Sequence, residues 1–388
     1  MKRGWVEVSL GELVEHRKVF FEIDDLSDYK RCRVRLHAQG IQLRDEVPGA
    51  LIETKKQQRC SRSDLLVAEI DAKVGGYGIV PEELDGAIVS SHYFLFAPKA
   101  AVIDYRYLGY VTRTQFFHDQ VVARGSTNYA AIRPHHVLGY RIPLAPLSEQ
   151  QRLVAHLEAI EDRLARSQEL REQQEQQLGA TLNSAFRRLE EDAEWVEMGE
   201  VAPLDRRPVS IEIDGEYPGL AARSFGRGIF HKPTLLGADL TWQKLFRVHA
   251  GDTVISNIKA WEGAIAVAGD TDHGRCASHR YLTCVADPER LLPEFLCFYL
   301  LSRDGLEKVG QASPGSADRN RTLAVKRLQK IEVPIPPLEA QRDFKRLLDL
   351  RTAIKRAASS VKERQDALVP SVLDRIFQRP CGRGSLGG

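Results

Sequence analysis

The chain repeats itself at a distance of about 190 residues, and this repeat constrains its fold more than any other feature. The matches at an offset of 190 are Trp5-Val6-Glu7 with Trp195-Val196-Glu197, Gly125-Ser126 with Gly315-Ser316, and Glu149, Gln151 and Arg152 with Glu339, Gln341 and Arg342. Shorter matches at offsets smaller by two or three are Arg35 and Gly40-Ile41 with Arg223 and Gly228-Ile229, and Ser91-His92 with Ser278-His279. Several matches in one order and at nearly one spacing predict two homologous halves.

Each half ends in a proline-rich hinge that is followed by a long polar stretch. The hinges contain Pro143 and Pro146 in the first half and Pro334 and Pro337 in the second. We expect long helices after them, the first with Ser148 as its N-cap residue and the second interrupted only by a proline near its end. A helix of about forty residues spans roughly 60 Å.

Apolar residues recur along both stretches at spacings of three, four and seven residues. Such a repeat predicts a narrow apolar seam that packs against another helix, interrupted in the first stretch at Arg171, Gln174 and Gly179. The predicted seam consists of Leu157, Ile160, Leu164, Leu178, Leu182 and Phe186 in the first helix, and of Leu347, Leu350, Ile354, Val361, Leu368 and Val372 in the second. We expect the helices to form an antiparallel coiled coil. The alternative is two unrelated amphipathic helices on separate globules.

The predicted fold class is α+β: two mixed α/β globular domains separated by two long helices that form an antiparallel coiled coil, with a pseudo-two-fold internal repeat. The predicted divisions are a first domain at 1–147, helices at 148–191 and 338–379, a second domain at 192–337, and a disordered tail at 380–388. Short apolar runs predict the strands Leu65-Val67, Ala87-Val89, Tyr93-Phe96, Thr253-Ile255, Ala264-Ala268 and Arg280-Cys284. Helical spacing predicts the helices Tyr105–Thr112 and Pro293–Leu301.

Composition excludes several classes of protein. Of 388 residues, 43% are hydrophobic and 28% charged, which is too apolar for a chain that is mainly disordered. The 55 Lys and Arg residues balance 53 Asp and Glu residues, which argues against a strongly basic, histone-like binder. No apolar run predicts a signal peptide or a membrane span, and the six cysteines form no CxxC pair. We therefore expect a cytoplasmic protein with reduced thiols and no metal site.

Basic and aromatic residues gather in both halves, and this pattern is the candidate nucleic-acid interface. Arg can contact base edges through two hydrogen bonds, and Lys binds phosphates. The alternative for any one of these residues is an ordinary solvated surface. The predicted DNA-binding residues are Arg31, Arg33, Arg35, Lys55, Lys56, Arg59, Lys73, His92, Arg206, Arg207, Arg223, Arg227, Lys259, Trp261, His279, Arg280 and Arg319.

The sequence predicts no catalytic residue. His92 and His279 each follow a serine, but adjacent strand residues point to opposite faces and form no catalytic dyad. Glu69 and Asp71 faintly suggest a nuclease site, yet the second half lacks the corresponding carboxylates. Methyltransferase glycine motifs, Walker motifs and HExxH are absent from the sequence.

Together, the hinges and the helices that follow them resemble the specificity subunit of a type I restriction-modification enzyme. The residues that carry the resemblance are Ile142 to Arg152 and Val333 to Arg342, each with its helix, and Trp5 and Trp195 near the start of each half. The resemblance covers nearly the whole chain. It departs from the pattern at Ala340, where the first half has Gln150, and this predicts a weaker start of the second helix.

The resemblance implies a DNA-binding protein without catalysis of its own. Each globule would be a target-recognition domain for one half of a split sequence in double-stranded DNA. The helices would be a spacer and a docking site for two methyltransferase (modification) subunits, which would bind S-adenosylmethionine. Restriction subunits that use ATP and Mg for translocation would join the assembly. Two alternatives stay open: a related system whose modification partner also carries the nuclease, and a duplicated scaffold that binds protein instead of DNA.

Overall fold

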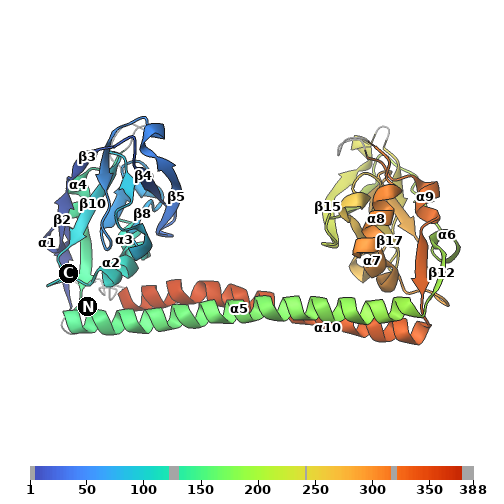
Figure 1. Ribbon diagram of the computed structural model, residues 1–388. Helices are drawn as coiled ribbons and strands as arrows, with labels where there is room; N and C mark the ends of the chain where they lie inside the picture. The colour runs from blue at the N-terminus through green and yellow to red at the C-terminus, as the bar shows by residue number, and fades with distance from the viewer. Residues whose placement is uncertain (1–4, 122–130, 241–242, 316–320, 378–388) are drawn as a thin grey trace, which may run out of the picture. The chain divides into compact units, whose positions relative to one another are not determined.

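Figure 1 shows the computed structural model, which describes residues 5–121, 131–240, 243–315 and 321–377. The chain divides into two compact units. Unit 1 comprises Met1–Arg171 and Ala358–Gly388, and unit 2 comprises Glu172–Ala357. Each unit therefore combines a globular part with one stretch from each long helix. Among the helices of the described ranges, none has the length together with the hydropathy that a membrane span requires.

Unit 1 is a mixed α+β body. Its strands are β1 (Val6–Ser9), β2 (Val14–Arg17), β3 (Phe20–Glu22), β4 (Asp28–Val34), β5 (Ile41–Pro48), β6 (Lys56–Arg59), β7 (Leu65–Ala68), β8 (Tyr77–Ile79), β9 (Ile88–Val89), β10 (Tyr93–Pro98) and β11 (Arg141–Leu144). Its short helices are α1 (Leu10–Leu13), η1 (Gly49–Leu51), η2 (Asp71–Val74), η3 (Glu82–Leu84), α2 (Tyr105–Thr112), α3 (Gln115–His118) and α4 (Pro134–Leu138). The sheets have the orders β3-β6-β9-β4-β5, β2-β10-β7-β8 and β1-β11.

Unit 2 repeats this arrangement. Its strands are β12 (Glu194–Glu197), β13 (Arg207–Pro208), β14 (Glu216–Ala222), β15 (Ile229–Leu236), β16 (Leu245–Arg247), β17 (Thr253–Ser256), β18 (Ile265–Val267), β19 (Cys276–Ser278), β20 (Tyr281–Cys284) and β21 (Glu332–Ile335). Its short helices are α6 (Met198–Val201), η4 (Gly237–Asp239), η5 (Ala260–Glu262), η6 (Asp270–Asp272), α7 (Pro293–Leu301), α8 (Arg303–Gln311) and α9 (Val325–Gln329). The sheets have the orders β13-β16-β19-β14-β15, β18-β17-β20 and β12-β21.

Shared topology confirms the internal repeat. In each five-stranded sheet one pair is parallel, β4 with β9 in unit 1 and β14 with β19 in unit 2. The apolar runs of β7 and β17 are buried along their whole length, as a central strand requires. Helices α2 and α7 have the predicted bounds.

Strand pairing places the repeat in a register that differs from the predicted one. In β1, Glu7 lies opposite Pro143, whereas in β12 Trp195 lies opposite Pro334. Trp195 therefore corresponds to Glu7, and the match of Trp195 with Trp5 is wrong by two residues. The surroundings differ accordingly, because Trp5 is 6% exposed and Trp195 is 39% exposed.

The predicted match of the two histidines is also wrong. The backbone N–H of Glu69 donates to the carbonyl of His92, and that of Asn257 donates to the carbonyl of Arg280. Arg280, 188 residues after His92, is thus its counterpart, and His279 is not. The match of Gly125-Ser126 with Gly315-Ser316 lies outside the described residues except at Gly315.

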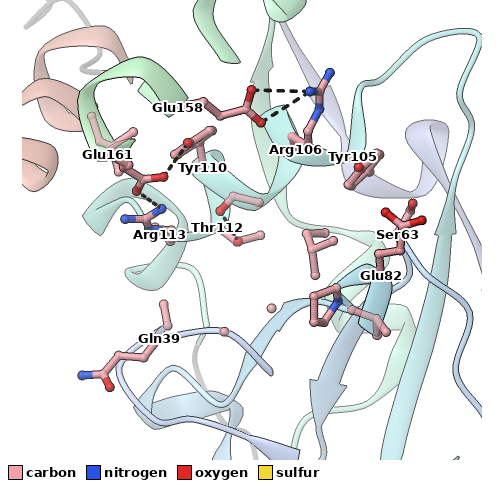
Figure 2. Close-up of a pocket in the computed structure, with 18 of the residues that line it drawn as sticks. Gln39, Ser63, Glu82, Tyr105, Arg106, Tyr110, Thr112, Arg113, Glu158 and Glu161 are labelled. Carbon is pink, nitrogen blue, oxygen red and sulfur yellow. Dashed lines mark hydrogen bonds and ion pairs between the residues drawn. The ribbon is translucent and has the colours of Figure 1, made fainter. Parts of the chain in front are cut away.

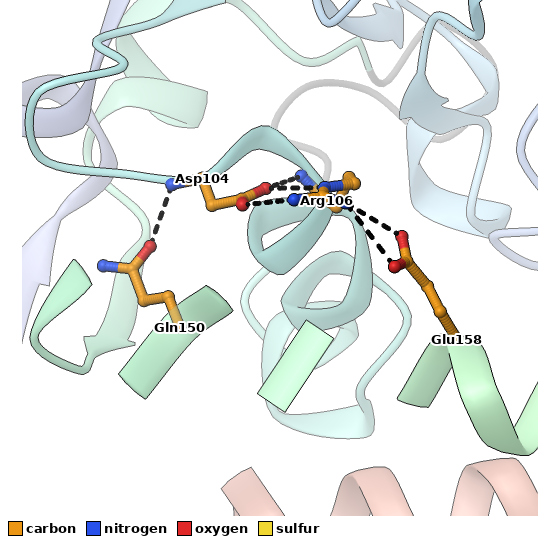
Figure 3. Close-up of polar contacts among 4 residues, drawn as sticks. All are labelled: Asp104, Arg106, Gln150 and Glu158. Atoms are coloured by element: carbon orange, nitrogen blue, oxygen red, sulfur yellow. Dashed lines mark hydrogen bonds and ion pairs between the residues drawn. The ribbon is translucent and has the colours of Figure 1, made fainter. Parts of the chain in front are cut away.

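The first turn of each long helix contains a buried glutamine, and the two glutamines are equivalent in the repeat. Helix α5 spans Leu147–Glu191 and α10 spans Leu338–Phe377. The Gln150 amide accepts from the Asp104 N–H at 2.9 Å and donates to the carbonyls of Val102 and Ala145 at 3.0 and 2.8 Å. Figure 3 shows the bond to Asp104, whose carboxylate also holds Arg106.

Gln341 makes the same three bonds in unit 2, to the Leu292 N–H and to the carbonyls of Arg290 and Pro336. Its counterpart is therefore Gln150, 191 residues earlier, and the predicted match with Gln151 is wrong by one residue. Ala340 does not replace this glutamine, so the start of the second helix is not weakened there. The predicted N-cap, Ser148, lies inside α5 instead.

Within each unit the two long helices pack antiparallel, as predicted. In unit 1 the Gln365 amide donates to the Ser167 hydroxyl at 3.1 Å, and Leu157 shares a core with Leu373. In unit 2 the rings of Phe186 and Phe344 lie 5.5 Å apart. In addition, Lys355 pairs with Glu175 at 2.5 Å, and this bond lowers the pKa of the Glu175 carboxyl.

The predicted seam is correct at the ends of α5 but wrong along most of α10. Leu157, Leu182 and Phe186 are buried, and Ile160, Leu164 and Leu178 are half-buried. In α10 the buried apolar residues are Phe344, Val369, Leu373 and Phe377. Of the predicted α10 positions, Leu347, Leu350, Val361 and Leu368 are exposed, whereas Ile354 and Val372 are half-buried. At three of the exposed positions the next residue is the more buried one, namely Leu348, Arg351 and Val369.

Candidate nucleic-acid interface

In each unit the tip of a long hairpin lies against a tight turn that ends a short 3₁₀ helix. The hairpin β4–β5 contacts the turn after η2, and β14–β15 contacts the turn after η5. The Ala38 N–H donates to the Gly75 carbonyl at 2.8 Å, and the Gly226 N–H to the Gly263 carbonyl at 2.9 Å. Gly75 and Gly263 have φ values of 78° and 76°, and a Cβ on Gly75 would lie 2.6 Å from the Ala38 nitrogen.

The hairpin tip of unit 2 brings predicted cations together with aromatic rings. The Arg223 guanidinium lies 5.0 Å from the centre of the Phe230 ring, and that of Arg227 lies 5.5 Å from Phe225. The Ser224 hydroxyl donates to Glu262 of η5 at 3.0 Å, which joins the tip to the neighbouring turn. Both arginines are exposed, so their guanidinium groups remain accessible to a ligand while they contact the rings.

Trp261 is the centre of the turn beside this tip. The Lys259 ammonium lies 5.3 Å and the Arg321 guanidinium 5.0 Å from its ring. Its indole N–H donates to the Ile258 carbonyl, so the ring is fixed in orientation. Lys259 also pairs with Glu262 at 2.5 Å, and this bond lowers the pKa of the Glu262 carboxyl.

The neighbouring loops supply further cations to unit 2, but with two different roles. Arg206 stacks on Phe246 at 3.7 Å and donates to the His279 carbonyl, and burial lowers its pKa. Arg207 pairs with the buried Asp252 at 2.7 Å. Arg207 is thereby a structural residue. His279 and Arg280 are exposed, and Arg319 lies outside the described residues.

The hairpin of unit 1 carries most of its cations at other positions, and Arg31 among them is paired with a carboxylate. Arg31 pairs with Asp45 at 2.6 Å, and this hydrogen bond lowers the Asp45 pKa. Arg33 and Arg35 are exposed on the same hairpin, and Lys73 is exposed on η2. The structure thus brings Arg35 and Lys73 to one end of unit 1, since the tip and the η2 turn are in contact.

Glu69 is an acidic group near this end of unit 1 that pairs with two other side chains. It binds the exposed imidazole of His92 at 2.8 Å and forms an ion pair with Arg133. The counterpart of Glu69 in unit 2 is Asn257, which carries no charge. In unit 1, His92 and Arg133 are therefore held by a carboxylate whose counterpart in unit 2 is the uncharged Asn257.

The remaining predicted residues of unit 1 lie elsewhere. Lys55 pairs with Asp25 at 2.5 Å and donates to the Gly49 carbonyl, next to η1. Lys56 and Arg59 lie on β6, over the rings of Phe20 and Phe21 at 5.3 and 4.7 Å. They form a second cation–aromatic group on the strand pair β3–β6.

A cavity of about 1070 Å³ in unit 1 was not predicted (Figure 2). It is lined by the hairpin tip at Gln39, by α2 and by the long helices. Its charged groups are paired across it: Arg113 with Glu161 at 2.8 Å, and Arg106 with Glu158 at 3.4 Å. The Tyr110 hydroxyl donates to Glu161, and burial raises the Tyr110 pKa. These pairs join the globular part to α5.

Sequence reasoning missed two residues of the interface, Phe225 and Arg133. It also missed that Arg321 stacks on Trp261. The first has a local signal, because Phe225 lies between Arg223 and Arg227 in a segment with glycines on both sides of Arg227. Arg133 is distant in sequence from Glu69, and only the fold brings them together.

Comparisons with known proteins agree with the fold. No protein-family model and no curated protein matches the chain. The HsdS subunit from Thermoanaerobacter tengcongensis is 22% identical over 97% of each chain, with a TM-score of 0.58. A chain from a study of complex assembly and conformational transition of the type I R-M system is 21% identical over 96% of this chain and 97% of its own, with a TM-score of 0.65. The predicted two-domain fold with long helices is thereby confirmed.

Proposed function

We propose that this chain, which has the fold of type I restriction-modification specificity subunits, is the DNA sequence-specificity subunit of such a system. The observation that carries the proposal is that the two units share one architecture but expose different residues at equivalent positions of it. Gly75 and Gly263 support their hairpin tips identically, whereas the tips contain His37 and Phe225 at equivalent positions. Two such modules suit the recognition of two unlike half-sites in double-stranded DNA.

The cations of both hairpin ends support DNA as the ligand. Arg and Lys bind the phosphate backbone, and stacked aromatic rings contact bases. A non-catalytic role follows in this proposal, since the methylation chemistry belongs to modification subunits that bind S-adenosylmethionine. Restriction subunits that use ATP and Mg would complete the assembly in the cytoplasm.

The exposed apolar residues of α10 support docking of the modification subunits on the helices. They are Leu347 and Leu350 in unit 2, 39% and 55% exposed, and Val361 and Leu368 in unit 1, 44% and 41% exposed. The seven-residue spacing that predicted the helix seam continues along this solvent-facing side. A row of apolar side chains outside the seam is suited to a helix from another subunit.

Domain exchange tests the proposal. Residues 1–145 are replaced by those of a homologue with a different methylation motif, and the genome of the host is sequenced for methylated bases. We expect one half-site to change and the other to stay. The control replaces residues 192–337 and changes the other half-site. A motif that stays the same, or that changes in both halves, contradicts the assignment of one half-site to each unit.

A further inference from the structure

The hairpin tip of unit 2 presents an aromatic ring from a backbone conformation that bulky residues avoid. Phe225 has a φ of +63°, in the left-handed region, and its side chain is 71% exposed. Only four described non-glycine residues have a positive φ, and one of the others is His37, at 59°, the counterpart of Phe225 in unit 1. A disfavoured conformation that occurs at the same exposed point of both units is typical of a binding position.

Phe225 does not stabilise the fold by burial. It belongs to none of the buried apolar clusters of unit 2. The left-handed region would suit glycine better, and Gly226 follows directly with a φ of 61°. The ring is therefore placed in solvent at a conformational cost, and strain of this kind gathers at binding and functional positions.

Backbone groups hold the tip in place. The Phe225 N–H donates to the Glu262 carbonyl at 2.8 Å, and the His37 N–H donates to the Val74 carbonyl at 2.7 Å. Because the side chain at this position takes no part in these bonds, it can differ between the units while the hairpin stays the same. The position thus combines a fixed backbone with a variable ring, as a specificity-determining residue requires.

The surroundings of Phe225 indicate the ligand. Arg227 lies beside its ring, Arg223 lies on the same hairpin, and Lys259 and Arg321 flank Trp261 on the adjacent turn. An apolar ring among several cations matches the arrangement of a base step between two phosphates. A protein surface that is uniformly acidic would be the other ligand for these cations, but it offers no flat partner for the ring.

We infer that Phe225 stacks on a base, or between two bases, of the half-site bound by unit 2, and that His37 takes the equivalent place in unit 1. This inference rests on the proposed function. Stacking by an apolar ring favours steps that unstack easily, such as pyrimidine–purine steps. The imidazole of His37 can also donate or accept a hydrogen bond at a base edge. The two half-sites therefore differ in how this position contributes to specificity.

The experiment uses the full chain assembled with its modification subunits and duplexes that carry the methylated motif of the host. 2-Aminopurine replaces one base at a time in the half-site of unit 2, and its fluorescence reports stacking. We expect a change at one step, which disappears in Phe225→Ala. That variant binds the motif duplex about 10- to 100-fold more weakly. The dependence of its affinity on salt stays unchanged, since every cation that faces a phosphate is still present.

Matched variants separate stacking from folding. Phe225→Trp keeps affinity within about 3-fold, because a larger ring also stacks. Phe225→Gly loses affinity as Phe225→Ala does, yet its Tm is higher by about 2 °C, since glycine suits the left-handed conformation. Ile213→Ala removes another apolar side chain of unit 2, 82% exposed, and leaves binding unchanged.

The outcomes distinguish the inference from the proposed function. If the unaltered assembly shows no preference for the motif duplex, the proposed function fails. If it does, and Phe225→Ala keeps the same preference and the same fluorescence change, the inference alone is overturned. Loss of the modification subunits from Phe225→Ala in gel filtration also overturns it, because the ring would then contact protein.

Discussion

The two units have the same architecture but neutralise their cations differently. In unit 1, Arg31 pairs with Asp45, and Glu69 holds both His92 and Arg133. In unit 2, Arg223 and Arg227 lie on aromatic rings, whereas Lys259 lies over Trp261 and also pairs with Glu262. The exchange of Glu69 for Asn257 at one backbone position accounts for part of this difference.

This contrast has a consequence for DNA binding. A cation on a ring can contact a phosphate without giving up its partner, whereas an ion-paired cation must share or break its pair. Exposed pairs are weak, so the penalty for each is small. We therefore expect unit 2 to contribute the larger share of the DNA-binding affinity. In unit 1, the ion pairs hold side chains in fixed orientations, so we expect this unit to contribute more to specificity than to affinity.

The largest expected effect tests whether the units are equivalent in their cores. Phe186 and Phe377 lie 191 residues apart and pack on Phe295 and Tyr107, respectively. Phe186→Ala and Phe377→Ala should each lower the free energy of unfolding by about 3–5 kcal/mol in denaturant titrations. Leu347→Ala, on the exposed face of α10, should change it by less than about 0.5 kcal/mol. A similar loss of unfolding free energy in Leu347→Ala would support the helix seam predicted from the sequence, in which Leu347 is packed.

The second prediction concerns the two buried glutamines. Gln150→Leu and Gln341→Leu each leave one N–H and two carbonyls without their side-chain partner, which should cost about 2–4 kcal/mol of unfolding free energy. Equal losses are expected because the three bonds are the same in both units. The control, Gln151→Leu, alters an exposed residue of α5 and should be nearly neutral. If Gln151→Leu is the more harmful change, the 191-residue register is refuted.

The third prediction addresses the cations directly. Replacing Arg223, Arg227 and Arg321 by Ala should weaken binding of the motif duplex at least 10-fold. It should also reduce the slope of log affinity against log salt by about 0.9 for each phosphate that the variant no longer neutralises. A triple variant of the unit 1 hairpin, with Arg31, Arg33 and Arg35 replaced, should lose less affinity; Arg35 in this set is the counterpart of Arg223. Binding titrations at several salt concentrations measure both, and an equal or larger loss from unit 1 would remove the proposed asymmetry.

The smallest effect comes from releasing one ion pair of unit 1. Asp45→Asn should raise DNA affinity about 2- to 5-fold, since Arg31 loses a competing carboxylate. The hydrogen bond from Arg31 lowers the Asp45 pKa, so this carboxyl stays ionised above its usual pKa and some way below it. The ratio of the affinities of Asp45→Asn and the unaltered chain should therefore be constant from pH 8 to pH 5.5. A ratio that falls toward one at pH 5.5 would show that Asp45 becomes protonated there.

Most of the fold could be predicted from the sequence, but the exact register could not. In strands, a shift of two residues leaves every side chain on the same face of the sheet. The alternation of apolar and polar residues is therefore compatible both with the match of Trp5 to Trp195 and with the correct match of Glu7 to Trp195. In α10, apolar residues occur in adjacent pairs, such as Leu347 with Leu348 and Leu368 with Val369. One residue turns a helix by about 100°, and only tertiary packing decides which member of each pair is buried.

The candidate site was predicted in part. The glycine turns and the basic hairpin residues follow from local signals, because a left-handed turn needs glycine and an exposed strand tolerates charge. Whether a cation is ion-paired or stacked depends on residues that are distant in the chain, such as Arg133 near Glu69. The cavity between α2 and α5 arises in the same way.

By itself, the sequence determined that the chain is a duplicated α+β protein with two long helices, since repeats, apolar runs and hinge prolines are local and additive. The tertiary structure alone decided which copies of a residue are equivalent, which face of α10 is packed and which exposed side chains share a surface. Those outcomes depend on backbone hydrogen bonds between distant segments, such as the bond from Phe225 to Glu262, which no spacing in the sequence encodes.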